Sequence, residues 1–368
     1  MKVLLVYKDY FPVLGGIENH LRLLATGLAT HKEMKVEVLV TDPGRRTQRL
    51  SMDGVSITKA GRWLTAASAP ISTSLFLEMR RRQADIYHLH FPYPIGEMAY
   101  LLAGAKGKLV ITYHSDIIRQ RRLLLLYRPF LWRLLGRADR IIVQSPNYVA
   151  SSPYLRRVAK KCTVIPSAVD MRRFEATEGA AVAAWRRRFP PPLVLFVGRF
   201  RYYKGLQYLI QAMKKIKATL LLSGSGPLES QLRHQVAALA LEDRIFFLGE
   251  VPDGELPSLY QAADIFVLPA CERSEAFGLT QVEAMASGVP VICTELGTGT
   301  SYVNIHGETG LVVPPRDPEA LAQAINTLLD NPGLRQQLGG GGRERAAREF
   351  GVETMVQRTI QLYQELVS

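Results

Sequence analysis

The chain contains little cysteine. Its 368 residues include only Cys162, Cys271 and Cys293, which lie far apart in the sequence. Such a set provides neither a disulfide framework nor the spacing of a cysteine-based metal site, so a reducing compartment is favoured. The length favours two domains, and a hydrophobic content of 47% is sufficient for two ordinary cores.

Long apolar runs are lacking as well. No stretch approaches the roughly 18 consecutive apolar residues that predict a membrane-spanning helix. Met1–Phe11 begins as a short strand and lacks the apolar region and the cleavage site of a signal peptide. We therefore expect a cytoplasmic protein.

Acidic residues are outnumbered by basic ones. Lys and Arg total 46 against 33 Asp and Glu, which gives a net charge of +13. This balance favours a polyanionic partner, which could be nucleic acid, an anionic membrane surface or a phosphorylated substrate. No known nucleic-acid-binding motif is present, so we expect no nucleic acid among the partners and rank a basic nucleic-acid-binding protein last.

The basic charge is dense in Arg119–Arg140, which reads RQRRLLLLYRPFLWRLLGRADR. The segment has the composition of a helix at a membrane interface, although Pro129 would interrupt or kink it. The alternative is a core helix with a solvated arginine face. On the first interpretation, the protein is peripheral on the inner face of the plasma membrane and contacts anionic lipid through Arg119–Arg140.

Metal-binding patterns are also missing. His88 and His90 alternate along a predicted strand and face the same side of it, but no third ligand accompanies them at metal spacing. We interpret them as structural or acceptor-side residues and expect no metal and no cofactor.

Short β-branched runs alternate with helical patterns twice along the chain. This alternation predicts two α/β domains, each with a doubly wound parallel sheet, and a ligand cleft where the two face each other. The charged, Ala-rich stretch Phe174–Pro192 separates them and reads as a linker with a short helix around Val182–Arg188. We expect domains at residues 1–170 and 190–350, followed by a last helix at 352–368.

The stretch Pro269–Pro290, PACERSEAFGLTQVEAMASGVP, lies between two strand-like runs. It holds two carboxylates, with Glu275 in a polar loop and Glu283 inside a predicted helix. Loops at the carboxyl ends of parallel strands are where open α/β sheets bind anionic ligands. Glu275 would face the group attached to a bound phosphate, and Glu283 could reach a sugar hydroxyl. Taken alone, this spacing is nearly uninformative and favours two solvated acids on a loop and a helix face.

The backbone after Phe277 suits a phosphate, because Gly278, Leu279 and Thr280 open the predicted helix. Helix N-termini present unpaired amides to anions. A second such junction is Gly15-Gly16, which precedes the helical pattern 17–29. It is not a dinucleotide fingerprint, since G-x-G-x-x-G is absent.

Two cations follow the first strand of the second half, in FVGRFRYYKG. Arg199 and Lys204 would lie at the mouth of the sheet, where they suit a diphosphate whose charge grows in the transition state. A plain surface cluster is the alternative, since Arg201 is nearby. His114, in ITYHSDI, ends a buried-looking strand and is either structural or directed at a ligand.

The motif E-A-F-G-L-T-x-x-E-A-M-A-S-G-V-P-V-I, from Glu275 to Ile292, closely resembles the nucleotide-sugar motif of retaining GT-B glycosyltransferases of glycosyltransferase family 4. Matches to this family extend from Gly15 to about Pro315. The resemblance implies two Rossmann-like domains facing an interdomain cleft. It also implies an N-terminal acceptor domain, to which the last helix returns, and a C-terminal donor domain.

The resemblance also implies roles for the matching residues. Arg199 and Lys204 correspond to the positions that hold the donor phosphates, Glu283 to the one that holds the ribose, and Glu275 to one that binds a donor-sugar hydroxyl. His114 would shape the sugar site. The remaining donor-binding positions are Gly15, Gly16, Ser223, Gly224, Val251, Phe277, Gly278, Leu279 and Thr280. Backbone near Val251 would read the base edge.

The chain departs from the family pattern in places. The frequent I-P-N-G-V-D is Ile165-Pro-Ser-Ala-Val-Asp170 here, and Ala276 stands where Gly is usual. Gly297–Asn304 resembles bacterial members that assemble O-antigen or capsule polysaccharides, several of them mannosyltransferases. No D-x-D triplet occurs, although metal-dependent glycosyltransferases of the other main fold usually need one, and its absence agrees with cationic side chains on the diphosphate.

From these observations we expect a retaining, metal-independent hexosyltransferase. It would move a sugar from GDP-mannose or a UDP-hexose to a glycan or lipid-linked acceptor in the synthesis of bacterial surface polysaccharide, including lipopolysaccharide, or glycolipid. Transfer would occur on one face of the sugar, with the leaving phosphate as base. The alternative is a GT-B nucleotide-sugar epimerase or hydrolase that uses the same pocket without an acceptor.

Overall fold

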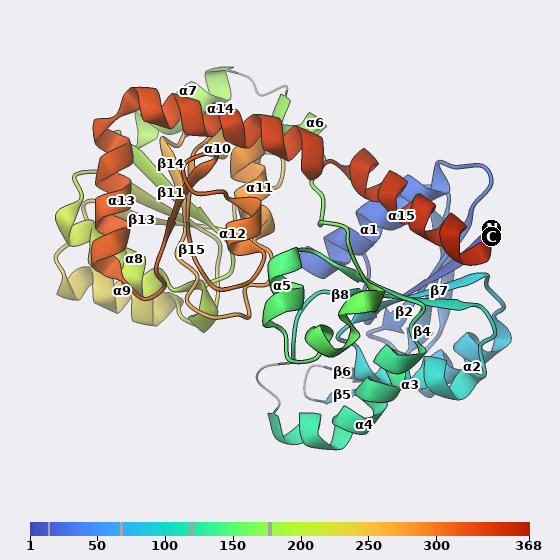
Figure 1. Ribbon diagram of the computed structural model, residues 1–368. Helices are drawn as coiled ribbons and strands as arrows, with labels where there is room; N and C mark the ends of the chain where they lie inside the picture. Colours follow the sequence, from blue (N-terminus) through green and yellow to red (C-terminus); the bar gives the residue numbers. More distant parts are fainter. Residues whose placement is uncertain (14, 67–68, 118–120, 176–178) are drawn as a thin grey trace. The chain divides into compact units, whose positions relative to one another are not determined.

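The computed structural model describes residues 1–13, 15–66, 69–117, 121–175 and 179–368, with the side chains of residues 66, 69 and 121–124 left aside. The chain divides into two compact units. Unit 1 contains Met1–Ala168 and Val352–Ser368, and unit 2 contains Val169–Gly351. Each unit has a mostly parallel sheet with helices on both faces, which makes it a Rossmann-like domain (Figure 1).

Unit 1 is built on a sheet whose described strands run in the order β10-β9-β8-β7-β1-β2-β4-β3. All neighbours are parallel except β3 and β4. The direction of winding changes between β1 and β7, which makes this the topological switch point. The strands are β1 (Lys2–Val6), β2 (Lys35–Asp42), β3 (Gln48–Met52), β4 (Val55–Gly61), β7 (Ile86–Phe91), β8 (Lys108–Tyr113), β9 (Arg140–Val143) and β10 (Cys162–Val164), with a separate pair β5 (Leu64–Ala66) and β6 (Ala69–Ile71).

The helices of unit 1 cover both faces of this sheet. Figure 1 shows α1 and α15 on one face and α2, α3 and α4 on the other. The last helix of the chain therefore completes the domain that the first residues begin. The helical segments are α1 (Gly16–Ala29), α2 (Thr73–Arg81), α3 (Pro94–Ala103), α4 (Arg121–Arg137), α5 (Pro146–Ser151), the 3₁₀ helix η1 (Leu155–Lys161) and α15 (Val352–Val367).

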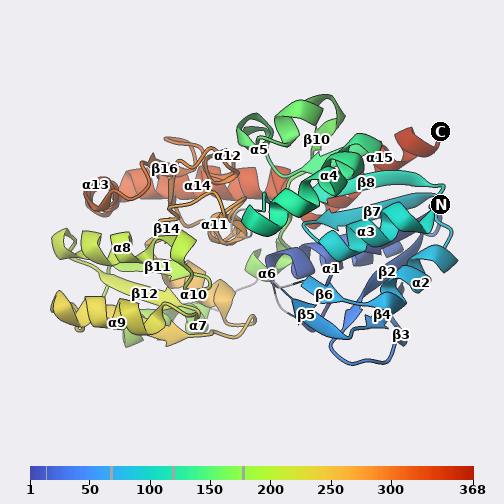
Figure 2. The ribbon, with the colours of Figure 1, turned by 90° about the horizontal axis from the view of Figure 1, so that it is seen from below.

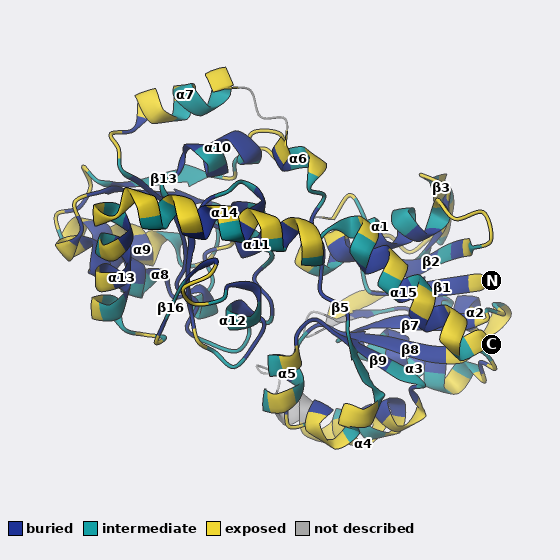
Figure 3. Ribbon diagram, turned by 45° about the horizontal axis from the view of Figure 1, so that its top comes forward, coloured by how far each residue is buried: buried dark blue, intermediate teal, exposed yellow. Residues whose placement is uncertain are grey.

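Unit 2 contains a parallel sheet in the order β13-β12-β11-β14-β15-β16. Its switch point lies between β11 and β14. The two central strands, β11 and β14, are fully apolar and buried, as parallel strands covered on both faces require, whereas the edge strand β13 is only partly buried (Figure 3). The strands are β11 (Leu193–Val197), β12 (Thr219–Ser223), β13 (Ile245–Gly249), β14 (Ile265–Leu268), β15 (Val291–Thr294) and β16 (Gly310–Val313).

The helices of unit 2 form two packed groups. Helices α8, α9 and α13 pack on one another, and Figure 2 shows α8 and α9 side by side. Helices α7, α10, α11 and α14 form the other group. The helical segments are α6 (Arg172–Glu175), α7 (Gly179–Arg188), η2 (Tyr202–Lys204), α8 (Leu206–Ala212), η3 (Met213–Lys215), α9 (Glu229–Ala238), α10 (Leu256–Ala262), α11 (Leu279–Ala286), α12 (Thr300–Val303), α13 (Pro318–Asp330) and α14 (Pro332–Glu349).

The segment expected to be a linker is packed into unit 2. Phe174 and Phe189 are buried in its core, and α7 lies against α10. The indole of Trp185 donates a hydrogen bond to Ser258 across 3.1 Å. The Ala-rich composition suggested an independent connector, but these three aromatic residues anchor the segment to the second domain.

The antiparallel pair β3 and β4 adds a hairpin to the expected alternation of strands and helices. The turn between them is Asp53-Gly54, and both residues have positive φ, at 51° and 76°. Asp-Gly with this geometry is the favoured connection of a two-residue hairpin. The Asp-Gly turn could therefore be read from the sequence. The strand β3 before it could not, because it is polar and shows little alternation of apolar residues.

Helix α14 contains four consecutive glycines, Gly339–Gly342, and remains helical through them. A Cβ atom on Gly339 would lie 2.2 Å from the carbonyl oxygen of Gly288, and one on Gly341 would lie 2.4 Å from that of Glu308. The glycines thus lower the helix propensity but let the helix approach neighbouring backbone closely.

Helix α4 occupies most of the basic segment Arg119–Arg140, of which residues 119 and 120 lie outside the described residues. Leu131, Leu134 and Leu135 are buried, whereas Leu125 and Leu126 are 68% and 77% exposed and Phe130 is 43% exposed. The helix continues through Pro129. Within the described part of the chain, no helix has the length and apolarity needed to cross a membrane.

Candidate active site

The predicted donor-site residues of unit 2 lie around its switch point. Arg199 and Lys204 follow β11, while Glu275 and α11 follow β14, which is the strand beside it. In open α/β sheets, ligands bind at the carboxyl ends of the strands at such a point. Lys204 and Glu275 are 71 residues apart in the sequence, so their contact could not be predicted from chain order. They meet because β11 and β14 are neighbours in the sheet.

Backbone hydrogen bonds join the loops at these strand ends. The amide of Gly198 donates to the carbonyl of Ser223 across 2.9 Å, and the amide of Phe200 donates to that of Ser225 across 2.7 Å. The amide of Gly224 donates to the carbonyl of Gly249 across 2.7 Å. The predicted turn at Ser223 and Gly224 is therefore a fixed part of the same loop cluster as Arg199.

Gly224 has no room for a side chain. Its φ is +127°, and a Cβ atom would lie 2.1 Å from the carbonyl oxygen of Gly198. The close approach of two strand-end loops thus depends on glycine at this position.

Lys204 and Glu275 form a buried ion pair. Their Nζ and Oε2 atoms lie 2.6 Å apart, and both side chains are about one-tenth exposed. Burial alone would lower the pKa of Lys204, but the carboxylate of Glu275, together with Tyr203 and Glu283, raises the pKa above its ordinary value. The lysine is therefore a permanent cation at neutral pH, and its charge is balanced by the acid predicted to bind the donor sugar.

The loop that carries Glu275 is held from behind. The hydroxyl of Thr298 donates to the carbonyl of Glu275 across 2.8 Å, and the amide of Gly299 donates to that of Ala276 across 2.7 Å. The Gly297–Asn304 stretch, noted in the sequence for its resemblance to bacterial members, therefore supports the candidate site from the next loop.

The N-terminus of α11 follows directly. Gly278 is its N-cap, with φ of +82°, and no side chain caps the first turn. The hydroxyl of Thr280 is buried without a hydrogen-bond partner among the described residues. Phe277 packs its ring on Phe350 in the core, and Leu279 is partly buried against the same core, so both can offer a ligand only backbone. This turn has the amides that an anion requires.

Glu283 accepts a hydrogen bond from the hydroxyl of Tyr260, with an O–O distance of 2.7 Å. Burial raises the pKa of Glu283, while the bond from Tyr260 and the charge of Arg173 oppose the shift. Sequence reasoning identified Glu283 and missed Tyr260, because a contact 23 residues away leaves no local pattern. The other carboxylate oxygen could accept from a hydroxyl of a ligand.

Arg199 and Val251 lie toward the surface of the loop cluster. Arg199 is exposed directly after β11, and Val251 is half-buried directly after β13. Val251 packs its side chain on the core, so only its backbone can read a base edge.

In unit 1, Gly15 is the N-cap of α1 and its backbone is extended, which any residue could adopt. A Cβ atom there would lie 2.2 Å from the carboxylate of Glu18. Glu18 pairs with Lys8 across 3.8 Å. The helix N-terminus at Gly15 and Gly16, predicted to face an anion, thus already has an acid beside it.

His114 belongs to a buried chain of hydrogen bonds in unit 1. Its Nε2 lies 3.0 Å from Nδ1 of His90, and its Nδ1 lies 2.8 Å from the amide nitrogen of Gln144. That nitrogen also donates to Ser167 across 2.7 Å, and Ser167 lies 3.2 Å from Nδ1 of His20. Both ring nitrogens of His114 are therefore engaged within the protein.

No third ligand was expected beside His88 and His90; among the described residues His90 instead belongs to a group with two other histidines. His20, His90 and His114 each offer a ring nitrogen, and these atoms lie within 4.8 Å of one another. His88 instead bonds Tyr363 and Thr112. The third ring was missed because His20 is on α1, 70 positions before His90, and only the tertiary fold brings them together.

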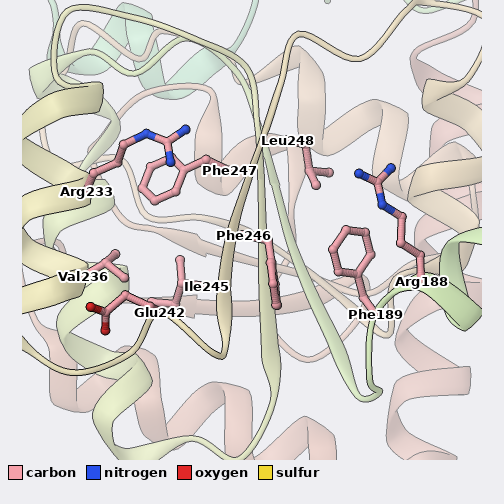
Figure 4. A pocket seen from close by; sticks show the side chains of 9 residues that line it. All are labelled: Arg188, Phe189, Arg233, Val236, Glu242, Ile245, Phe246, Phe247 and Leu248. Atoms are coloured by element: carbon pink, nitrogen blue, oxygen red, sulfur yellow. The ribbon is translucent and has the colours of Figure 1, made fainter.

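A separate hollow of about 350 Å³ lies at β13, the edge strand of unit 2. Figure 4 shows Phe246 and Phe247 between Arg233 on one side and Arg188 with Phe189 on the other. None of the predicted site residues lines it, so we do not assign it to the chemistry.

Two family models match the chain. The one described as Glycosyltransferase Family 4 matches residues 14–173, and the one described as Glycosyl transferases group 1 matches residues 182–345. The D-rhamnosyltransferase WbpZ of Pseudomonas aeruginosa is 39% identical over 358 residues, which cover 95% of this chain and 92% of that protein. The chain belongs to glycosyltransferase family 4.

This glycosyltransferase also resembles the O-antigen chain mannosyltransferase C of Escherichia coli, at 35% identity over 370 residues that cover 100% of this chain and 99% of the relative. Among solved structures, the sucrose-phosphate synthase of Thermosynechococcus elongatus superposes with a TM-score of 0.82 at 27% identity, covering 99% of this chain and 98% of that one. The expected GT-B fold with two Rossmann-like domains is confirmed.

Proposed function

We propose that this glycosyltransferase moves a hexose from a nucleotide-diphosphate sugar to a glycan acceptor, with retention of the anomeric configuration. The observation that carries the proposal is the group at the β11/β14 switch point, where the Lys204–Glu275 pair lies beside the loop leading to the uncapped N-terminus of α11. A fixed cation, a helix N-terminus and a sugar-directed acid are what a sugar diphosphate requires.

The diphosphate would be held by Arg199, Lys204 and the amides of Leu279 and Thr280. As the bond to the sugar breaks, negative charge grows on the leaving phosphate, and preorganised cations stabilise it. The chemistry then needs no divalent cation on the diphosphate. Binding would exchange part of the Lys204–Glu275 interaction for a phosphate, which leaves Glu275 able to accept from a sugar hydroxyl.

The nucleoside would lie between β12, β13 and α11. Glu283, oriented by Tyr260, would accept hydrogen bonds from the ribose hydroxyls. Ser223 and Gly224 would line the same pocket, and backbone near Val251 would face the base. Transfer would take place on one face of the sugar, with the leaving phosphate accepting the proton of the acceptor hydroxyl.

The names of the relatives narrow the substrates. One is a D-rhamnosyltransferase and one an O-antigen chain mannosyltransferase. D-Rhamnose is 6-deoxy-D-mannose, so both sugars have the manno configuration. We therefore favour a manno-configured donor and a growing bacterial surface polysaccharide as acceptor, in preference to a UDP-hexose and an unrelated acceptor.

We further propose that α4 contacts an anionic membrane surface. Its exposed Leu125, Leu126 and Phe130 lie among arginines on a helix that packs its other side on unit 1. Apolar side chains beside cationic ones are typical of helices that rest on anionic lipid. A lipid-linked glycan acceptor would then be reached at that surface.

The test is a titration of GDP, UDP and ADP in the presence of a chelator, followed by melting temperature. One nucleotide should stabilise the protein, and the corresponding sugar nucleotide should then be consumed with a saccharide acceptor present. Slow consumption with the donor alone, and none dependent on acceptor, would support a hydrolase or epimerase. No response to any nucleotide would remove the assignments of Lys204 and Glu283.

A further inference from the structure

Three histidine rings converge inside unit 1, and one of them is His114, which the family resemblance places near the sugar site. His20 is on α1, His90 is on β7 and His114 directly follows β8. Their ring centroids lie 5.6 Å (20 to 90), 5.0 Å (20 to 114) and 5.3 Å (90 to 114) apart. All three side chains are buried, with exposed fractions of 4% or less.

These separations match a tetrahedral metal site. A Zn–N bond of about 2.0–2.1 Å places each imidazole centroid roughly 3.2 Å from the ion, so tetrahedral ligands have centroids about 5.2 Å apart. The ring nitrogens lie within 4.8 Å of one another, and the closest recorded pair, from His90 and His114, is 3.0 Å apart. Tetrahedral ligand nitrogens lie about 3.3 Å apart, so the rings would have to rotate, and the direct contact between His90 and His114 would have to open, to bring three nitrogens to one ion.

The partners of the rings fit the same arrangement. Metal-bound histidines usually donate their other N–H to a nearby acceptor, which fixes the tautomer. Nδ1 of His20 has Ser167 as its neighbour, and Nδ1 of His114 has the Gln144 amide. In both rings this leaves Nε2 to face the cluster.

The orientation of the Gln144 amide decides what the cluster can bind. If its NH₂ group donates to Nδ1 of His114 and to Ser167, then Nδ1 of His114 is an acceptor and the proton of that ring is on Nε2. Ser167 then donates to Nδ1 of His20, so the proton of His20 is also on Nε2. If the amide is rotated by 180°, its oxygen accepts hydrogen bonds from Nδ1–H of His114 and from the hydroxyl of Ser167. The oxygen of Ser167 then accepts from Nδ1–H of His20. Both Nε2 atoms then present lone pairs, and nitrogen and oxygen of an amide are nearly equivalent in shape.

The rings are neutral at physiological pH, because burial lowers the pKa of His20 to about 4 and holds the pKa values of His90 and His114 well below the usual range. Nε2 of His90 is also buried without a hydrogen-bond partner among the described residues. It is Nδ1 of His90 that faces His114, so a metal bound through that atom would leave Nε2 as the nitrogen without a partner.

We propose that His20, His90 and His114 form a binding site for one divalent transition-metal ion, with Zn²⁺ as the favoured ion. Imidazole suits zinc, copper and nickel, whereas magnesium and calcium prefer oxygen. The three ligands come from α1, β7 and the β8 end, so the ion would clip the first helix to the centre of the sheet. Three protein ligands leave a fourth position for water or a substrate oxygen.

The experiment uses the full chain, stripped with a chelator and dialysed. Co²⁺ is added and the visible absorption of tetrahedral cobalt is recorded, and Zn²⁺ is then titrated by calorimetry. We expect one ion per chain, displacement of cobalt by zinc and a higher melting temperature with zinc. His20→Gln, His90→Gln and His114→Gln should each lose the cobalt spectrum and the thermal response.

Two controls separate the site from other histidines. His88→Gln changes a buried ring outside the group, and His31→Gln changes an exposed one, so both should keep the spectrum. Gln144→Leu keeps every ligand but removes the orienting amide, and it should weaken zinc binding about 10- to 100-fold. If the stripped wild-type protein gives no tetrahedral cobalt spectrum, or if His90→Gln retains it, the proposal is wrong. These readouts do not involve nucleotide or transfer.

Discussion

Nζ of Lys204 and Oε2 of Glu275 lie 2.6 Å apart in a buried ion pair that joins the ends of two adjacent strands in unit 2. The residues were assigned separately from the sequence, one to the donor phosphates and the other to the donor sugar. Their contact means that each holds the other in place before a donor binds. Stability and catalysis should therefore be coupled at this point.

Breaking the pair from one side should damage both properties. Lys204→Met would leave Glu275 buried without its cation, at a cost of about 3–5 kcal/mol in unfolding free energy, and should lower turnover roughly 10²–10³-fold. The double variant Lys204→Met with Glu275→Gln should recover most of the stability and none of the turnover. Denaturant unfolding and steady-state kinetics would measure this. Recovery of activity in the double variant would contradict the assignment.

Arg199→Ala should reduce turnover by about 10²–10³-fold, because one charge-stabilising donor is worth roughly 2.7–4 kcal/mol in the transition state. Since Arg199 is exposed, the melting temperature should change little. Arg187→Ala, at an exposed arginine of α7, is the matched control and should leave kinetics unaltered. Near-normal turnover in Arg199→Ala would move the phosphate site elsewhere.

Nucleotide affinity should fall on acidification, and the fall should begin at a pH above the ordinary pKa of a glutamate. The pKa of Glu283 is raised, and the carboxylate accepts from ribose hydroxyls more strongly than the protonated acid does. The bound state therefore holds fewer protons than the free state, so binding weakens as pH drops through the raised pKa rather than near about 4.3. Calorimetry of the nucleotide that binds, from pH 8 down to 5, would detect the loss.

The control for this pH dependence is Glu283→Gln, which should bind weakly at every pH and show a flat profile. Tyr260→Phe removes one hydroxyl that favours the carboxylate, so its loss of affinity should begin at a higher pH than in the wild type. An unchanged profile in Glu283→Gln would assign the titration to another group.

Gly224→Ala should destabilise unit 2 by about 1–3 kcal/mol, because the residue has φ of +127° and its Cβ would meet backbone 2.1 Å away. Gly254→Ala is the matched control, since no atom lies within 4 Å of its Cβ position. Chemical denaturation would compare the two. Equal stability of both variants would show that the strand-end loops can separate at no cost.

Sedimentation with vesicles containing anionic phospholipid should carry the protein down at low salt and release it at high salt, as expected for α4. Leu125→Asp with Leu126→Asp should reduce the bound fraction severalfold. The control is Leu102→Asp, which changes a leucine of α3 that is 70% exposed and should leave the bound fraction unchanged. Binding that persists in the double variant would place the lipid contact on another surface.

Local signals in the sequence were sufficient for the alternation of strands and helices. They also identified the strand-end glycines and the helix that begins after Gly278, since each depends on a few adjacent residues. The expected roles of Lys204, Glu275 and Glu283 agree with their positions at one switch point, although nothing in the structure tests those roles.

Long-range pairings could not be predicted in the same way. Tyr260 on Glu283 and His20 beside His114 depend on which strands become neighbours, and periodicity carries no record of that. The prediction of a linker at Phe174–Pro192 was wrong for a related reason. A charged, Ala-rich segment has the composition of a linker, and the sequence does not show that its few aromatic residues pack into the core of unit 2. The hairpin at Asp53-Gly54 differs from these cases, because its Asp-Gly turn is a local sequence pattern that predicts a hairpin.

The return of α15 to unit 1 has a consequence for synthesis on the ribosome. Tyr363 closes a hydrogen bond to His88, and Val356 packs where Gly27 leaves room on α1. The first domain to be translated therefore lacks one of its covering helices until the last residues emerge, whereas unit 2 is continuous in sequence. A nascent chain released before Val352 would expose an apolar face of α1 and invite aggregation, so the order of completion should be second domain first.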